Sequence, residues 1–138
     1  MKIKAEIMFL DGKPNKNGRI YTAETANNIL ETWREHKDIN FGDVDYDDFK
    51  PKNICGQISN IWLEGDTIIA EGELFDNHIG TKILKELNKV GLGMYLSFSG
   101  AGTYDYDNKT IKDYELVCFH LANESAFYVS KIEELYEC

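Results

Sequence analysis

The chain has 138 residues, of which 43% are hydrophobic, and its formal net charge is −9. This length fits one domain that can bury about two thirds of its unfolded surface without metals or disulfides. The acidic excess argues against binding of nucleic acid through phosphates, which needs a basic surface. The apolar runs are far shorter than the roughly 18 residues that cross a bilayer, and the first residues do not resemble a signal peptide. We therefore expect a soluble, cytoplasmic protein that binds neither nucleic acid nor membrane.

The cysteines give no sign of a metal site or of a disulfide framework. Cys55, Cys118 and Cys138 are widely spaced and include no CxxC pair. The three histidines show no metal-ligand spacing, and no glycine-rich phosphate loop follows a strand. We expect reduced, mostly buried thiols, no metal and no cofactor.

The first part of the chain reads as a strand, a polar loop and a helix. Residues 2–9 alternate between polar and apolar, which places four apolar side chains on one face of a strand: Ile3, Ala5, Ile7 and Phe9. Asp11-Gly12 ends this pattern, and Thr22 is placed to cap a helix. The helix carries apolar residues at helical spacing: Ala26, Ile29, Leu30 and Trp33.

The second part alternates hairpins with a helix. A strand over residues 39–44 leads into an acidic loop, and residues 54–63 and 67–75 form a hairpin around a turn at residues 64–66. A helix over residues 78–90 carries Ile79, Ile83, Leu84 and Leu87 on one face and stops at Gly91. Residues 92–100 and 110–121 form a second hairpin, with its turn at residues 105–108. Residues 128–138 form a tail with apolar residues at helical intervals, which suggests a short helix that docks on the domain or on a partner.

This order of elements predicts an α+β fold. Adjacent strands are expected to be mostly antiparallel, and the most economical arrangement is a small β-barrel flanked by two or three helices.

The acidic loop resembles the start of a calcium-binding loop only superficially. Asp43, Asp45 and Asp47 have the spacing of the first ligands, but Asp48 replaces the glycine of the sixth position and Ile54 replaces the glutamate of the twelfth. We expect a solvated loop that repels anions or presents negative charge to a basic partner.

Two segments far apart in the chain point to a known family. Asn17-Gly18-Arg19-Ile20-Tyr21 follows the first strand, and Leu96-Ser97 is followed by Gly100 and Gly102 after a helix that ends in glycine. This order of motifs resembles the prohead (capsid maturation) serine proteases of tailed bacteriophages, in particular the T4-like branch. The resemblance runs from about Phe9 to Ala126. It implies a herpesvirus-protease-like barrel over residues 1–127 with a tail at 128–138, and an enzyme that cuts scaffold and capsid proteins inside the immature head.

The resemblance also assigns three catalytic positions. The family's general-base histidine, in Gly-Glu-Leu-x-His-Pro, matches Tyr46 in residues 42–47 of this chain. The nucleophile, in a hydrophobic-Ser-x-x-Gly segment, matches Ser97, and the third member, usually acidic, matches His120. Glu124 stands where the family has a proline. Histidine in the third place also occurs in the related herpesvirus enzymes, so this change alone does not abolish the chemistry.

Tyrosine is poorly suited to the role of general base. Its pKa is about 10 in water, so at neutral pH it holds its proton, and the neighbouring aspartates disfavour a phenolate further. Loss of one triad member typically costs a factor of about 10⁴ to 10⁶ in turnover. Two rescues stay open: His120 contacts Ser97 directly and acts as the base, or Ser99 is the reactive hydroxyl.

Each of these residues also has a purely structural interpretation. Ser97 and Ser99 can satisfy backbone groups on a strand, and His120 can be a hydrogen-bonded interior histidine. Asn17-Gly18 favours a tight turn with positive φ, which Arg19 can fasten to a carboxylate or to backbone carbonyls.

Three hypotheses follow. The first is a protease-like protein with a degenerate triad, a pseudoenzyme that serves as a structural or binding component in head assembly or in the virion. The second is an active serine endopeptidase that uses Ser97 with a rearranged triad. The third is an unrelated acidic interaction module of a phage or mobile element. The first two imply capsid, scaffold or other head proteins as partners, a possible homo-oligomer, and a location in the host cytoplasm or in the prohead.

Overall fold

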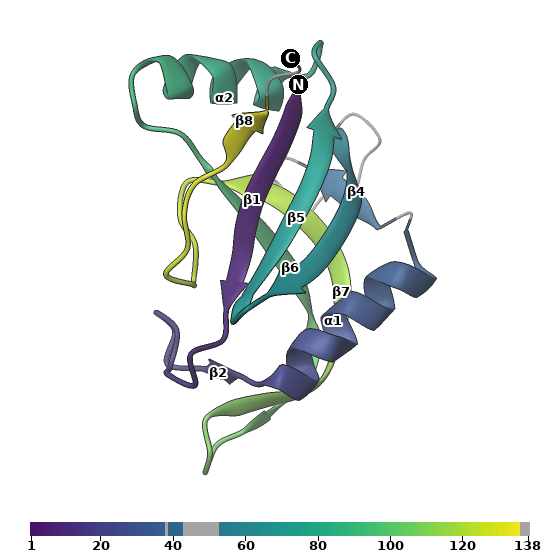
Figure 1. Cartoon of the computed structure of the whole chain (residues 1–138), viewed down its shortest axis with the longest axis vertical. Helices are drawn as coiled ribbons and strands as arrows, with labels where there is room; N and C mark the ends of the chain where they lie inside the picture. The colour runs from purple at the N-terminus through teal and green to yellow at the C-terminus, as the bar shows by residue number, and fades with distance from the viewer. Residues whose placement is uncertain (38, 43–52, 136–138) are drawn as a thin grey trace.

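The computed structural model describes residues 1–37, 39–42 and 53–135 (Figure 1). Tyr46, Cys138 and the acidic loop at residues 43–48 lie outside these ranges. The described residues form eight strands and two helices, in the following order: β1 (Lys2–Phe9), β2 (Ile20–Tyr21), α1 (Ala23–Glu35), β3 (Asn40–Gly42), β4 (Ile54–Glu64), β5 (Thr67–Leu74), α2 (Ile79–Lys89), β6 (Tyr95–Asp105), β7 (Thr110–Ala122) and β8 (Glu133–Leu135). Neither helix is long and apolar enough to cross a membrane.

The strands form one mixed sheet, with the order β2-β7-β3-β4-β5-β1-β8 and with β6 paired to β7. The two expected hairpins, β4–β5 and β6–β7, are both present and antiparallel, whereas β2 and β3 run parallel to β7. The fold class is α+β as predicted, but the predicted barrel is wrong because the sheet does not close. Among the described residues β1 does not pair with β6, and its second edge pairs with β8 at residues 2–4.

Strand β1 departs from simple alternation at its end. The pairing with β5 shifts register between Glu6 and Met8, which marks a β-bulge. As a result Met8 is fully buried, whereas Phe9, expected on the core face with Ile3, is 40% exposed. The bulge reverses which side chains face the core after Ile7.

Helix α1 packs against β7 through the apolar face that its sequence predicted. The Thr22 hydroxyl accepts a hydrogen bond from the Thr25 amide and caps the helix. The buried Thr25 hydroxyl in turn donates to the carbonyl of Ile111 on β7, at 2.6 Å. The four expected apolar residues, Ala26, Ile29, Leu30 and Trp33, are all buried.

Helix α2 uses only part of its apolar face. The ring nitrogen Nδ1 of His78 accepts a hydrogen bond from the Gly80 amide at 2.9 Å and caps the helix. Leu84 is fully buried, but Ile79 and Ile83 are 61% and 47% exposed. The stripe predicted from helical spacing therefore exists, but the described chain covers only the part of it around Leu84 and leaves Ile79 and Ile83 exposed.

The tail is not helical where it is described. Lys2 and Leu135 face each other in the antiparallel pair of β1 and β8, which lie side by side in Figure 1. Before this strand, the Ile132 amide donates to the Met94 carbonyl at 2.8 Å, and the side chain of Ile132 is buried. A helix of a few residues forms too few hydrogen bonds to offset the cost of nucleating it. An extended segment instead pairs with the unpaired N–H and C=O groups at the edge of β1.

Candidate active site

The β6–β7 hairpin brings two of the predicted site residues together. Ser97 and His120 are direct partners in the antiparallel register, and Ser99 is the direct partner of Cys118. Opposite residues of an antiparallel pair point to the same face, with Cβ atoms about 4.5–5.5 Å apart. Four polar or titratable side chains from the two strands therefore occupy one face of the hairpin.

Cys118 connects the other members of this group. Its Sγ lies 2.9 Å from the Ser99 hydroxyl and 3.9 Å from Nδ1 of His120. Sequence reasoning named both serines and the histidine but treated Cys118 only as a buried thiol. The two-residue spacing of Cys118 and His120 on one strand was the available signal, because it places both side chains on one face.

The environment of His120 favours the neutral imidazole. The residue is only 5% exposed, and its burial lowers the pKa to about 4. At neutral pH the ring is uncharged and able to accept a proton, but the resulting imidazolium is disfavoured at this position. Catalysis by a Ser–His pair passes through that imidazolium.

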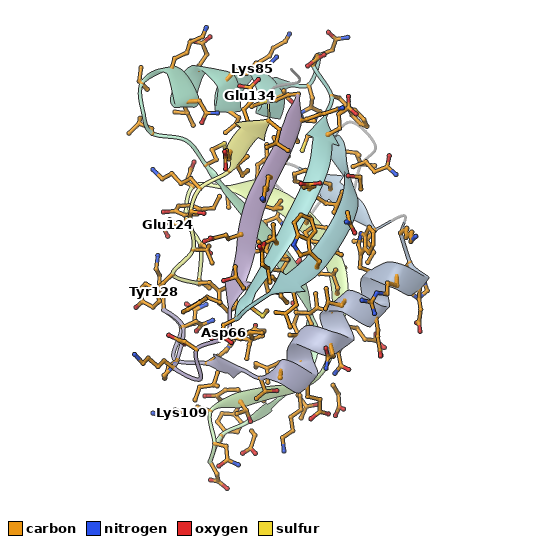
Figure 2. All side chains as sticks on the ribbon, in the orientation of Figure 1. Asp66, Lys85, Lys109, Glu124, Tyr128 and Glu134 are labelled. Atoms are coloured by element: carbon orange, nitrogen blue, oxygen red, sulfur yellow. The ribbon has the colours of Figure 1, made fainter. Side chains whose placement is uncertain are left out.

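The predicted position of the general base, Tyr46, lies outside the described residues. Strand β3 ends at Gly42, which is the direct partner of His120 in the parallel β3–β7 pair. The chain then continues into residues 43–52, which carry Tyr46 and lie outside the described residues. Glu124, at the family's proline position, is exposed at the margin of the molecule (Figure 2).

The loop before β2 is held by Asn15, a residue that the sequence did not single out. The Asn15 Oδ1 atom accepts hydrogen bonds from the amides of Asn17 and Arg19, at 2.9 and 3.0 Å. Gly18 has a φ of 76°, a conformation that favours glycine. The Arg19 guanidinium lies over the ring of Tyr104, 5.7 Å from its centroid, rather than on a carboxylate. Asparagine side chains often accept hydrogen bonds from the backbone two residues later, so the position of Asn15 before the turn could have indicated this role.

A cavity of about 420 Å³ borders Ser97 and this loop. One part of its lining is aromatic, formed by four rings that pack against one another: Tyr21, Phe98, Tyr114 and Phe127. The other part is polar and includes Asn15, Arg19, Ser97 and Ser125. Burial raises the pKa of Tyr21 and of Tyr114, so both phenols stay protonated at neutral pH.

The two glycines after the serines are required by close packing of the strands. A Cβ atom on Gly100 would lie 2.1 Å from the Glu115 carbonyl oxygen and 2.7 Å from the Tyr114 ring. A Cβ atom on Gly102 would lie 2.9 Å from the Lys112 carbonyl oxygen. Both glycines lie at register shifts of this pair, between Ser99 and Gly100 and between Ala101 and Thr103, where β6 approaches β7 closely.

A solved structure with this arrangement of elements is known. No family model matches the sequence, and no curated protein matches it. The bacteriophage T4 capsid assembly protease, gp21, is similar with a TM-score of 0.65, over 87% of this chain and 80% of that one. The chain has a phage prohead protease-like fold. The sequence identity is 12%, so the likeness concerns the fold alone. The prohead-protease-like α+β fold that the order of motifs implied is thereby confirmed, but the barrel that it also implied is not.

Proposed function

We propose that the protein is a prohead-protease-like component of phage head assembly whose site binds peptide but does not cleave it efficiently. The observation that supports this is the burial of His120, whose pKa is lowered to about 4. A base this weak accepts a serine proton less readily than an ordinary imidazole, by roughly a hundredfold. Tyr46 at the expected base position supports the same conclusion, because a phenol with acidic neighbours holds its proton.

The same proposal covers partners, domain limits and location. The fold and the order of motifs favour capsid, scaffold or other head proteins as partners, and a location in the host cytoplasm or in the prohead. Residues 1–127 would form the protease-like domain, and residues 128–138 the tail that reaches β1.

The test uses purified scaffold and capsid proteins of the phage that encodes this chain. They are incubated with the wild type, with Ser97→Ala, with His120→Gln and with the control Ser59→Ala, which changes an exposed serine on β4. We expect stable binding and no cleavage with all four proteins. Cleavage by the wild type and Ser59→Ala that disappears in Ser97→Ala would overturn the proposal.

A second candidate, an active serine endopeptidase, is favoured by the direct pairing of Ser97 with His120. In that case the Ser97 hydroxyl attacks the peptide carbonyl while His120 takes its proton and returns it to the leaving amine. A fluorophosphonate probe, followed by peptide mass spectrometry, distinguishes the candidates. Labelling at Ser97 that is lost in His120→Gln supports the endopeptidase, labelling at Ser99 identifies the other hydroxyl, and no labelling supports the binding protein.

A further inference from the structure

The cavity beside Ser97 runs along the backbone of β6. Six consecutive residues, 97–102, contribute to its lining. Successive side chains of a strand point to opposite faces, so a cavity on one face alone would be lined by every second residue. The backbone of residues 97–102 therefore borders the cavity together with the side chains.

The outer edge of β6 carries no paired strand in the described part of the chain, although β1 lies beside part of it. Within the described part of the chain, β7 is the only strand that pairs with β6. A strand at the edge of a sheet presents unpaired N–H and C=O groups, which bind extended peptides by strand addition. This stretch of the edge carries only small, exposed residues: Gly100, Ala101 and Gly102.

The aromatic part of the lining forms a pocket for a bulky apolar side chain. Phe98 and Phe127 are stacked, with centroids 5.7 Å apart, and Tyr21 meets Phe127 edge-on at 5.0 Å. Tyr21 and Phe98 are half-buried, so their rings are partly open to the cavity. The volume of about 420 Å³ accommodates a large side chain together with adjacent backbone.

The wall opposite β6 is already in place. The Lys16 amide donates to the Ala126 carbonyl at 2.8 Å, which ties the loop before β2 to the segment after β7. The Phe127 amide donates to the Ser125 hydroxyl at 3.1 Å and fixes that segment locally. Binding therefore needs little ordering of the protein, which favours affinity.

We propose that this groove binds an extended peptide that pairs with the outer edge of β6 and places an aromatic side chain in the pocket of Tyr21, Phe98, Tyr114 and Phe127. The inference rests on the proposed function, to which it adds the class of peptide. Alternate residues of the bound peptide point toward the aromatic pocket and toward the face that carries Ser97 and His120. An aromatic residue would therefore set the register of the peptide against Ser97.

The test measures peptide binding to Ser97→Ala protein, which removes the hydroxyl and keeps binding separate from cleavage. The probes are fluorescein-labelled peptides of sequence Thr-Val-X-Val-Thr, with phenylalanine, leucine or glycine at X, followed by fluorescence anisotropy. We expect the phenylalanine probe to bind at least about tenfold more tightly than the glycine probe. Alternate amides of an extended peptide lie on opposite edges, and only one edge pairs with β6. N-methylation of the amides on that edge should abolish binding, and N-methylation of the other set should not.

Two changes in the pocket and one control complete the design. Tyr21→Ala removes one ring and Ala126→Trp fills the groove, and each should weaken the phenylalanine probe at least about tenfold. Phe75→Ala changes a phenylalanine that is 51% exposed and outside the cavity, and it should leave binding unchanged. Circular dichroism checks the fold of each variant.

Equal binding of the phenylalanine and glycine probes, binding that is insensitive to N-methylation, or no binding at millimolar peptide would each overturn the inference. Binding of the head proteins without binding of these peptides would support the proposed function and overturn only the inference about this groove. Binding of the peptides without binding of the head proteins would support the groove and overturn the proposed function.

Discussion

Replacing Gly100 by alanine should destabilise the fold far more than its exposure suggests. Gly100 is exposed, and exposed substitutions usually change stability by about 0.5 kcal/mol or less. Here, however, the new Cβ would lie 2.1 Å from the Glu115 carbonyl oxygen, whereas ordinary contacts begin at 3.4 Å. The two strands would have to separate by more than an ångström, or Tyr114 and the backbone would have to move together.

The magnitude follows from these two costs. Overpacking typically costs about 1–3 kcal/mol, and each weakened ladder hydrogen bond costs about 1 kcal/mol. We therefore expect Gly100→Ala to lower the free energy of unfolding by about 3 kcal/mol. The control is Gly65→Ala in the β4–β5 turn, where φ is 61° and nothing lies within 4 Å of the new Cβ. Its cost is limited to the left-handed backbone, about 1 kcal/mol.

Urea unfolding followed by circular dichroism measures both variants against the wild type. An unchanged slope with a lower midpoint would show that Gly100→Ala changes stability and not the unfolded state. A cost for Gly100→Ala that is no greater than that for Gly65→Ala would show that the close approach of β6 to β7 does not exist in solution.

Three further predictions concern single side chains. The pKa of His120 is about 4 in the folded protein, against 6.5 ordinarily, so the wild type should lose unfolding free energy as the pH falls from 6.5 to 4. The loss is at most about 3 kcal/mol, and urea unfolding at each pH should show it absent from His120→Asn. Leu84→Ala should cost about 3 kcal/mol in thermal unfolding and Ile83→Ala less than about 1, because Leu84 is fully buried and Ile83 is 47% exposed. Asn15→Ala should lower the free energy of unfolding by about 1–2 kcal/mol and speed hydrogen exchange of the Arg19 amide, which donates to the Asn15 side chain. Asn17→Ala should change neither, because its side chain does not accept that hydrogen bond.

Local chemistry made much of the fold predictable. Gly65 between two β-rich runs indicated a hairpin, and Thr22 before a helical pattern indicated a capped helix, because both signals depend on neighbouring residues alone. The two hairpin strands end within a residue of their predicted limits, and the helix begins directly after Thr22.

Features that depend on distant partners were not predictable. The bulge that turns Phe9 outward belongs to the pairing of β1 with β5, and alternation along β1 does not encode it. The tail became a strand because the edge of β1 was available to it. The aromatic pocket draws Tyr21 and Phe127 from opposite ends of the chain, so no local pattern could have revealed it.

The pairing of β1 with β8 has a consequence for synthesis of the protein on the ribosome. Lys2 is translated more than a hundred residues before its partner Leu135. One edge of β1 therefore waits, unpaired, while the more than one hundred residues between the two strands are produced, and such edges are prone to join other chains. Polysomes that translate many copies side by side would present several of these edges at once, so the yield of folded protein should depend on how densely ribosomes are loaded on the message.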